Sequence, residues 1–220
     1  MSEVTITVRG EHETRVAPEE AVAHISVRAE GPERGAVVER IAAVAAPLRE
    51  DLASRNDAGG LSEWSSQRVS IWANRPWNNE GKQLALVHYA SVEITATFTD
   101  FAVLSWWLSD VAERDGVQID SVNWRLTSAS ASSTEAEVAA QAVKVAVDRA
   151  TAYASAIGLS TVVPLEIADL GLLTDASAGP SAAPKMMRAM AMDSSGGPAV
   201  GMQPEDIVVT AAVEARFLAR

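Results

Sequence analysis

The chain of 220 residues contains no cysteine. Disulfide bonds, thiolate metal sites and cysteine nucleophiles are therefore excluded together. The absence of cysteine does not identify the cellular compartment.

Basic residues are scarce, because 18 Lys and Arg stand against 29 Asp and Glu and give a formal net charge of −11. Broad nucleic-acid binding needs clustered Lys and Arg that displace counterions from phosphates, so this balance argues against it. The balance argues equally against binding to an anionic membrane surface. Hydrophobic residues make up 48% of the chain, which is enough to bury a core and is unlike a disordered chain.

Long apolar runs are absent as well, since none approaches the ~18 residues needed to span a bilayer. The N-terminal stretch MSEVTITVRGEHET also lacks the basic region followed by an apolar core that marks a secretory signal. We therefore expect no membrane insertion and a cytoplasmic protein. An envelope or periplasmic location would apply if an export signal has been removed.

Sequence motifs for catalysis, phosphate binding and metal binding are missing too. The three histidines, His12, His24 and His88, are far apart, and none has a partner at a metal-ligand spacing such as H-x3-H. No glycine-rich phosphate-binding pattern occurs. The serine-rich segment Ser128 to Thr134 lacks a G-x-S-x-G context, so a connection and helix cap explain it better than a nucleophile. We expect no cofactor, no metal and no enzymatic activity.

The clearest element that is present is a helix from Thr134 to Gly158. Thr134 and Glu137 fit the T-x-x-E capping box, in which each side chain satisfies a backbone donor at the helix start. Gly158 occupies the place of a left-handed residue just after the helix end, and Leu159 follows as the apolar residue that closes such an end. The many alanines between these ends favour the helix and allow it to lie close against a sheet.

Two further helices are predicted. The first begins after Gly31-Pro32 and carries apolar residues at helical spacing as far as Leu52, with a kink or break expected at Pro47. The second is amphipathic, with Asp100 as its N-cap and Gly116 closing it.

The rest of the chain alternates apolar and polar residues with the period of strands that have one covered side. A Pro inside one of these strands favours an edge position or a bulge. The expected strands are Val4 to Val8, ended by Gly10; Glu20 to Glu30; Leu61 to Ala73; Leu84 to Thr99; Val117 to Ser128; Val162 to Leu173, interrupted by Pro164; and Ile207 to Leu218.

These elements predict an α+β fold of mostly antiparallel sheets packed against about three helices, in a single domain over residues 1–220. A long segment rich in Met and Ala, about residues 174–203, precedes the last strand. It has no clear periodicity and is long for a loop in a compact domain. It is a mobile lid, a segment that orders against a partner, or a disordered loop.

Six tryptophans stand out in a chain with few other aromatic residues. Five fall on expected regular elements, so we expect them to pack in the core: Trp64 and Trp72 on one face of the same strand, and Trp106, Trp107 and Trp124. Trp77 differs, because it lies in the polar connection NRPWNNEGKQ of an expected hairpin. It either anchors an interface or stacks on a sugar, or it folds back onto its own hairpin.

Five of the six methionines lie between Met186 and Met202. A flexible Met-rich segment adapts to irregular surfaces, so it can act in self-association or as a lid over a groove. Copper binding through Met is a weak alternative, because no His or Cys accompanies the cluster. The candidate interface or ligand contacts are therefore Trp77, Met186, Met187, Met190 and Met192.

Several segments in their order along the chain resemble the SIMPL domain (DUF541) family, which includes a periplasmic immunogen of Brucella. VTITVRGEHETRVAPEEAVAHISVRAE looks like the family's first two strands, with its Pro18 followed by acidic residues and Ala. GVQIDSVNWRLTSAS and the Ala-rich helix ending in AIGLS look like its central strand–helix unit. MQPEDIVVTAAVEARFLA is similar to its closing strand, although Pro204 is not followed by Gly.

The resemblance implies an α+β fold and large ring- or channel-like homo-oligomers, and it implies no catalytic residues. Most relatives carry an export signal, and this sequence departs from them there. Our leading hypothesis is a non-enzymatic scaffold that self-assembles into a ring, channel or shell. The alternative is a binding module for a glycan or protein partner, with a groove gated by residues 174–203 and with Trp77 nearby.

Overall fold

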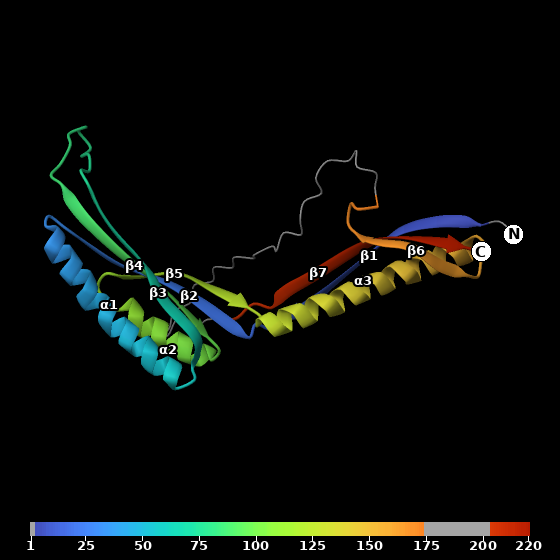
Figure 1. The fold of residues 1–220 in the computed structure, drawn as a ribbon, viewed down its shortest axis with the longest axis horizontal. Coiled ribbons are helices and arrows are strands. Elements are labelled where there is room, and N and C mark those ends of the chain that lie inside the picture. The colour runs from blue at the N-terminus through green and yellow to red at the C-terminus, as the bar shows by residue number, and fades with distance from the viewer. Residues whose placement is uncertain (1–2, 174–202) are drawn as a thin grey trace. The chain divides into compact units, whose positions relative to one another are not determined.

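The computed structural model describes residues 3–173 and 203–220. Of Gln67, within the first range, it describes the backbone but not the side chain. The described residues form three helices and antiparallel strands, so the predicted α+β fold is confirmed. They divide into two compact units, each seen in Figure 1 as one sheet with its own helices. Unit 1 contains residues 3–17, 126–173 and 206–220, and unit 2 contains residues 18–125 and 203–205.

Unit 1 is a three-stranded antiparallel sheet covered on one face by a single long helix (Figure 1). The strand order is β1-β7-β6, so the last strand of the chain lies in the centre. The elements are β1 (Val4–Val16), α3 (Ser128–Ala156), β6 (Val162–Asp169) and β7 (Ile207–Ala219).

Helix α3 presents a face of small residues to this sheet. Ala142, Ala146, Ala150 and Ala154 are almost fully buried there. Across from them, a Cβ at Gly10 would overlap the Ala142 carbonyl oxygen and lie 2.7 Å from the Ala146 backbone nitrogen. The sequence suggested that Gly10 ends the first strand, and this was wrong, because β1 continues to Val16. Gly10 lies inside the strand, where its missing side chain lets the backbones of helix and sheet approach closely.

The start of α3 also differs from its prediction. The helix begins at Ser128, with the Thr127 side chain accepting a hydrogen bond from the Ser130 backbone N–H at 3.3 Å. Thr134 and Glu137 lie inside the helix, so the capping-box assignment and the loop assigned to Ser128–Thr134 were wrong. Ser and Ala are both tolerated inside a helix, and the earlier threonine provides the cap.

The end of α3 is as predicted. Gly158 has a φ of +79°, and its N–H donates to the Ser155 carbonyl at 3.1 Å. The Leu159 N–H donates to the Ala154 carbonyl at 2.9 Å, which completes a Schellman motif. The side chain of Leu159 then packs against the core of unit 1.

Strand β6 carries the predicted edge proline. It forms one edge of the sheet, and its register against β7 shifts between Pro164 and Glu166. A proline cannot donate a hydrogen bond to a neighbouring strand, which explains both features. The strand ends at Asp169, earlier than expected.

Unit 2 is a four-stranded antiparallel sheet in the order β3-β4-β2-β5, with both of its helices on one face (Figure 1). One core contains residues of both helices and the facing side chains of the strands. The elements are β2 (Glu20–Gly31), α1 (Arg34–Asp57), β3 (Leu61–Asn74), β4 (Val87–Phe98), α2 (Phe101–Ala112) and β5 (Val117–Arg125).

Alternation along β2 and β4 builds this core. In β2 the residues Ala21, Ala23, Ile25, Val27 and Ala29 face the helices and are buried, as their spacing predicted. From α1 the buried residues are Val37, Ile41, Ala45, Leu48 and Leu52, again at the predicted positions.

The helices of unit 2 follow the sequence in most respects. Helix α1 runs without a break through Pro47, whose exposed position places the missing hydrogen bond on the solvent side. Asp100 caps α2 by accepting hydrogen bonds from the Ala102 and Val103 backbone N–H groups, at 2.8 and 3.1 Å. Gly116 does not close α2 as predicted, because the helix ends at Ala112 with Glu113 as its C-cap. Gly116 lies in the turn before β5, with the left-handed φ of +78° that favours glycine.

Three of the five tryptophans expected in the core are there. Trp107 is fully buried, lies 5.0 Å from the Phe98 ring, and donates from Nε1 to Asp51 Oδ2 at 2.8 Å. Trp64 and Trp124 are half-buried against the same core. Trp106 and Trp72 were wrongly assigned, because they are 69% and 49% exposed.

The close packing of α3 leads to a test. Replacing Ala146 or Ala150 by Leu inserts a branched side chain where the sheet leaves no room, so each change should lower the free energy of unfolding by about 1–3 kcal/mol. Urea denaturation measures this effect. Ala140→Leu, on the exposed face of the same helix, is the matched control and should change stability by less than about 0.5 kcal/mol. Equal stability of all three variants would show that the buried face is misassigned.

Candidate functional site

The β3–β4 hairpin extends past the rest of unit 2. Figure 1 shows its strands and connection continuing beyond the first turn of α1. We call residues 68–93 the hairpin arm: strand residues 68–74, the connection 75–86, and strand residues 87–93. The two strands keep a regular antiparallel register from Arg68↔Glu93 to Asn74↔Val87. The predicted hairpin with a long polar connection is therefore confirmed.

The tip of the arm is an ordered turn. The Asn78 side chain accepts hydrogen bonds from the backbone N–H groups of Glu80 and Lys82, at 3.1 and 2.8 Å. Gly81 supplies the positive φ of +73° that this turn needs. Trp77 pairs with Gln83 through its backbone and has 68% of its surface exposed. Trp77 therefore does not fold back onto the hairpin.

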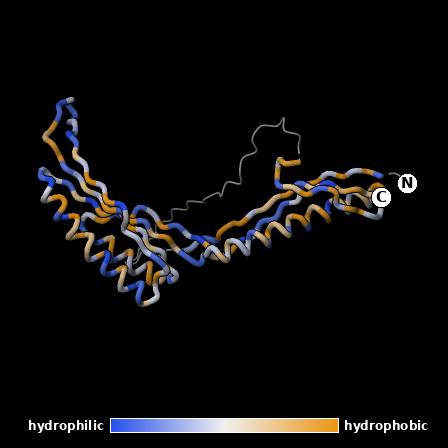
Figure 2. Tube along the Cα trace, viewed as in Figure 1, coloured by the Kyte–Doolittle hydropathy of each residue, from blue (hydrophilic) through white to orange (hydrophobic). Residues whose placement is uncertain are grey.

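A set of large apolar side chains lies exposed along the arm, and Figure 2 shows hydrophobic stretches along it. Isolated exposed apolar residues are common on soluble proteins, but a concentration within one short segment is typical of an interaction site. The exposed fractions are 54% for Val69, 41% for Ile71, 49% for Trp72, 68% for Trp77, 44% for Leu84 and 39% for Leu86.

A β-bulge explains why Trp72 is not in the core. The register against β4 shifts between Ser65 and Arg68, where β3 has one residue more than its partner. A single extra residue reverses which side chains face the helices. Trp64 consequently faces the core, while Trp72 faces the opposite side and stacks on Tyr89 with ring centroids 5.4 Å apart. The prediction that both tryptophans share a face was wrong for this reason.

A shallow hollow lies beside the paired strands of the arm, next to the first residue of α1. Its volume is about 250 Å³, and it is lined by Arg34, Ile71, Trp72, Ala73 and His88. Ile71, Trp72 and Ala73 give the lining an apolar part, and Arg34 and His88 give it a polar part.

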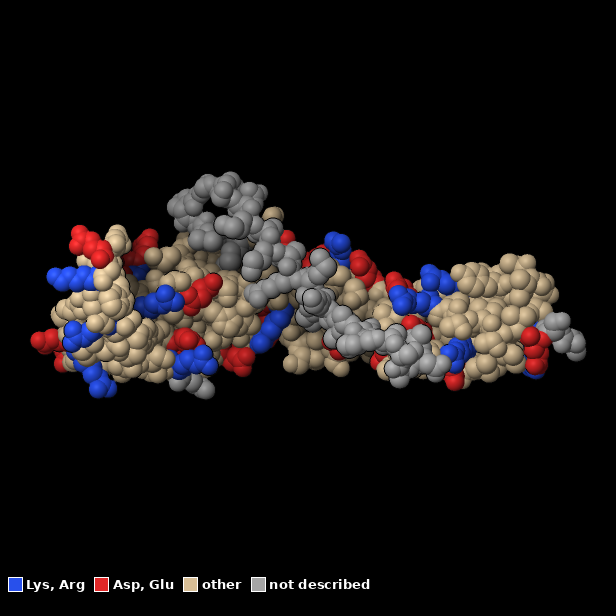
Figure 3. Space-filling view, turned by 90° about the horizontal axis from the view of Figure 1, so that it is seen from above, with Lys and Arg blue, Asp and Glu red and all other residues tan. Residues whose placement is uncertain are grey.

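A polar cluster occupies the face of the unit 2 sheet that no described helix covers. Arg125 donates from Nε to Glu20 at 2.7 Å and from Nη2 to Glu63 at 3.1 Å. The hydrogen bond with Glu20, supported by Glu63, raises the pKa of the Arg125 guanidinium against the opposing effect of burial. Arg125 therefore stays charged and holds strands β5, β2 and β3 together. Charges of both signs are interspersed over unit 2 in Figure 3.

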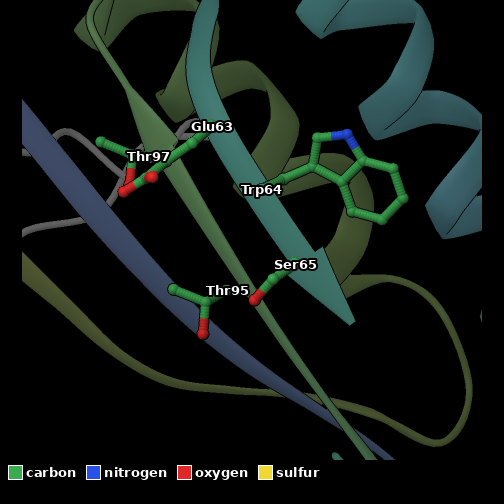
Figure 4. Close-up of a pocket in the computed structure, with 5 residues that line it drawn as sticks. All are labelled: Glu63, Trp64, Ser65, Thr95 and Thr97. Atoms are coloured by element: carbon green, nitrogen blue, oxygen red, sulfur yellow. The ribbon is translucent and has the colours of Figure 1, made fainter. Parts of the chain in front are cut away.

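A second hollow, of about 150 Å³, lies beside this cluster. Figure 4 shows Glu63, Ser65, Thr95 and Thr97 on one side of the sheet and the Trp64 ring on the other, toward the helices. Thr97 donates to Glu63 at 3.4 Å, and Thr95 lies 3.4 Å from His24 Nδ1. Hydroxyls and a carboxylate line this hollow, so its chemistry is that of a polar surface.

The remaining candidate residues are placed as follows. His12 lies on β1 of unit 1, and His24 and His88 lie on β2 and β4 of unit 2. Within residues 3–173 and 203–220, no group of three His, Asp or Glu side chains could hold a metal ion. Met186, Met187, Met190 and Met192 lie outside the described residues.

Two groups of residues were missed at the level of sequence. The uncharged stretch Val69 to Ala73 and the apolar Leu84 and Leu86 flank the Trp77 connection, and this pattern was a usable signal. The Glu20–Arg125–Glu63 cluster had no such signal, because its members come from three strands far apart in the chain.

A scan against models of known families matches residues 6–217 to SIMPL, described as a protein of unknown function (DUF541). The match spans both units, and the chain belongs to this family. No curated protein matches the chain. No helix in the described part of the chain is long and apolar enough to cross a membrane.

The polar cluster gives a prediction about stability. The Glu20 side chain is 12% exposed and that of Glu63 is 69% exposed, although both bind Arg125. Glu20→Ala should lower the free energy of unfolding by about 1.5–3 kcal/mol, as expected for a lost charged hydrogen bond. Glu63→Ala should cost less than about 1 kcal/mol, since water screens an exposed pair. Urea denaturation of both variants tests this, and equal losses would contradict it.

Proposed function

We propose that this protein is a non-enzymatic structural protein that self-assembles into a ring-, channel- or shell-like homo-oligomer. The observation that carries the proposal is the concentration of exposed apolar side chains on the hairpin arm. An ordered arm with exposed tryptophans amid other apolar residues fits a protein partner, because Trp is enriched among the residues that dominate binding and the buried core of an interface is apolar.

The energetics require several of these side chains to act together. Fully burying one large apolar side chain contributes about 1.5–3 kcal/mol. Association costs about 4–15 kcal/mol in lost translational and rotational freedom. One or two partly exposed residues cannot offset this cost, whereas a contact that buries most of the arm can. The partner proposed is a second copy of the chain, since closed symmetric assembly is common among soluble oligomers.

The mass of the purified particle tests the proposal. Light scattering at micromolar concentration should give a mass several times the 23.2 kDa of one chain. Trp77→Ala combined with Leu86→Ser should lower that mass, because it removes apolar area from the arm. Trp106→Ala is the control, since Trp106 is equally exposed but lies on α2. A monomer for the unaltered chain would overturn the proposal.

A second candidate function is ligand binding at Trp77, for example stacking on a glycan. The exposure of the Trp77 ring favours it, because a sugar ring packs against a free aromatic face. The segment 174–202, which was expected to gate the groove, lies outside the described residues.

Tryptophan fluorescence distinguishes this candidate from self-assembly. Titration with a panel of neutral oligosaccharides should change the emission of the unaltered protein and not that of Trp77→Ala. Trp72→Ala serves as a control for general changes on the arm. A signal that is unchanged by every glycan, or that survives in Trp77→Ala, would count against ligand binding at this residue.

A further inference from the structure

Among the described residues, the two sheets leave four strands at an edge. From the strand orders these are β1 and β6 in unit 1, and β3 and β5 in unit 2. An edge strand has unpaired backbone N–H and C=O groups, which act as a template for pairing with another strand. Proteins usually protect such edges with charged residues, proline or bulges.

Three of these edges carry such protection. Strand β1 has Arg9 and Glu11 along its length, and Arg149 of α3 donates to the Arg9 carbonyl at 2.6 Å. Strand β6 contains Pro164, with a register shift directly after it. Strand β5 has a register shift against β2 at Asp120. The Asp120 carboxylate accepts a hydrogen bond from the Ser26 hydroxyl and forms an ion pair with Arg28, both on β2.

Strand β3 is protected only in its first half. Register shifts fall between Leu61 and Glu63 and between Ser65 and Arg68. From Arg68 to Asn74 the pairing with β4 is regular, and the other edge of this stretch has no strand beside it among the described residues. Residues 69–73 within this stretch have the sequence VSIWA, which contains no charged residue, proline or glycine. Such a stretch has the composition that favours strand pairing between chains.

Both faces of this stretch carry accessible apolar side chains. Val69 and Ile71 pair with Val92 and Ala90, so they lie on the helix side of the sheet, and Trp72 lies on the other side. All three are more than 40% exposed. The hollow of about 250 Å³ lined by Ile71, Trp72 and Ala73 opens here and has room for a partner's side chain.

We propose that residues 69–73 of β3 pair edge to edge, in antiparallel orientation, with the same residues of a second copy of the chain. This inference rests on the proposed self-assembly and names the contact that makes it. The regular stretch 68–74 has its midpoint at Ile71, so the two-fold axis passes there. Val69 then lies opposite Ala73, and Arg68 lies opposite Asn74, so no like charges meet.

The pairing has a consequence for the assembly. It joins two four-stranded sheets into one continuous sheet of eight strands across two copies. A two-fold contact of this kind uses the same patch on both copies and therefore closes on itself. A ring, channel or shell larger than a dimer must use a second surface in addition.

Single-cysteine variants test the pairing directly, since the chain has no cysteine of its own. Residues that face each other across antiparallel strands have Cα atoms about 4.5–5.5 Å apart, within the range of a disulfide. Under oxidised glutathione, Ile71→Cys should form a covalent dimer on a non-reducing gel, and more completely than Val69→Cys or Ala73→Cys. Ile167→Cys, equally exposed on the protected edge β6, should give no dimer above background.

A charge on the edge provides an independent readout. Ile71→Lys places two like charges at the two-fold axis and should reduce the particle mass by at least twofold, while Ile167→Lys should not. A thermal unfolding midpoint close to that of the unaltered chain shows that both variants remain folded.

The outcomes separate the two proposals. If the unaltered chain is oligomeric but no cysteine between residues 69 and 73 gives a dimer and Ile71→Lys leaves the mass unchanged, edge pairing is wrong and self-assembly stands. If the unaltered chain is a monomer, both proposals fail.

Discussion

The strands of the β3–β4 hairpin are longer than the helices that could cover them. Strand β3 has 14 residues, or about 46 Å at the usual rise, and α1 has 24 residues, or about 36 Å. The connection 75–86 extends the hairpin further. A sheet can bury its apolar face only where a second layer lies on it. The mismatch leaves the connection uncovered, with Trp77, Leu84 and Leu86 exposed. Val69 and Ile71 are exposed for another reason: their β4 partners Val92 and Ala90 are buried, but β3 is the edge strand. The proposed function follows from both exposures.

The two units solve the problem of burial in different ways. Unit 2 fills the space between sheet and helices with large side chains such as Phe98, Trp107 and Leu108. The described residues of unit 1 contain one helix, which gains contact by bringing backbones together, with a row of alanines on α3 and Gly10 on β1. Close approach of this kind tolerates no added volume, so each member of the contact constrains the others.

The polar features of the structure set limits on where it can bind. The cluster of Arg125, Glu20 and Glu63 balances its own charges and ties three strands together. Protected edges on β1, β5 and β6 discourage pairing, whereas β3 carries no protection between Val69 and Ala73. In the proposed assembly, an unprotected edge on β3 with protection at the other edges restricts strand pairing to one contact.

Alternating and helical spacing in the sequence was enough to locate the seven strands and three helices found in residues 3–173 and 203–220, and to predict the α+β class. Local chemistry also determined the Schellman end at Gly158 and the Asp100 cap, because each depends on neighbouring residues only. The missing N–H of Pro164 predicted an edge or a bulge in its strand, and the tertiary strand order shows both. The resemblance to the SIMPL family, visible in the sequence, is confirmed by the family match over residues 6–217.

Tertiary structure decided the features that depend on distant residues. The bulge in β3 placed Trp72 opposite to Trp64, and the approach of α3 gave Gly10 its role inside a strand. The earlier cap at Thr127 and the exposure of Trp106 likewise emerged only in the structure. Sequence spacing shows which residues share a face, but strand order and helix coverage show whether that face or edge has a partner. For β3 that distinction separates a core strand from an exposed edge.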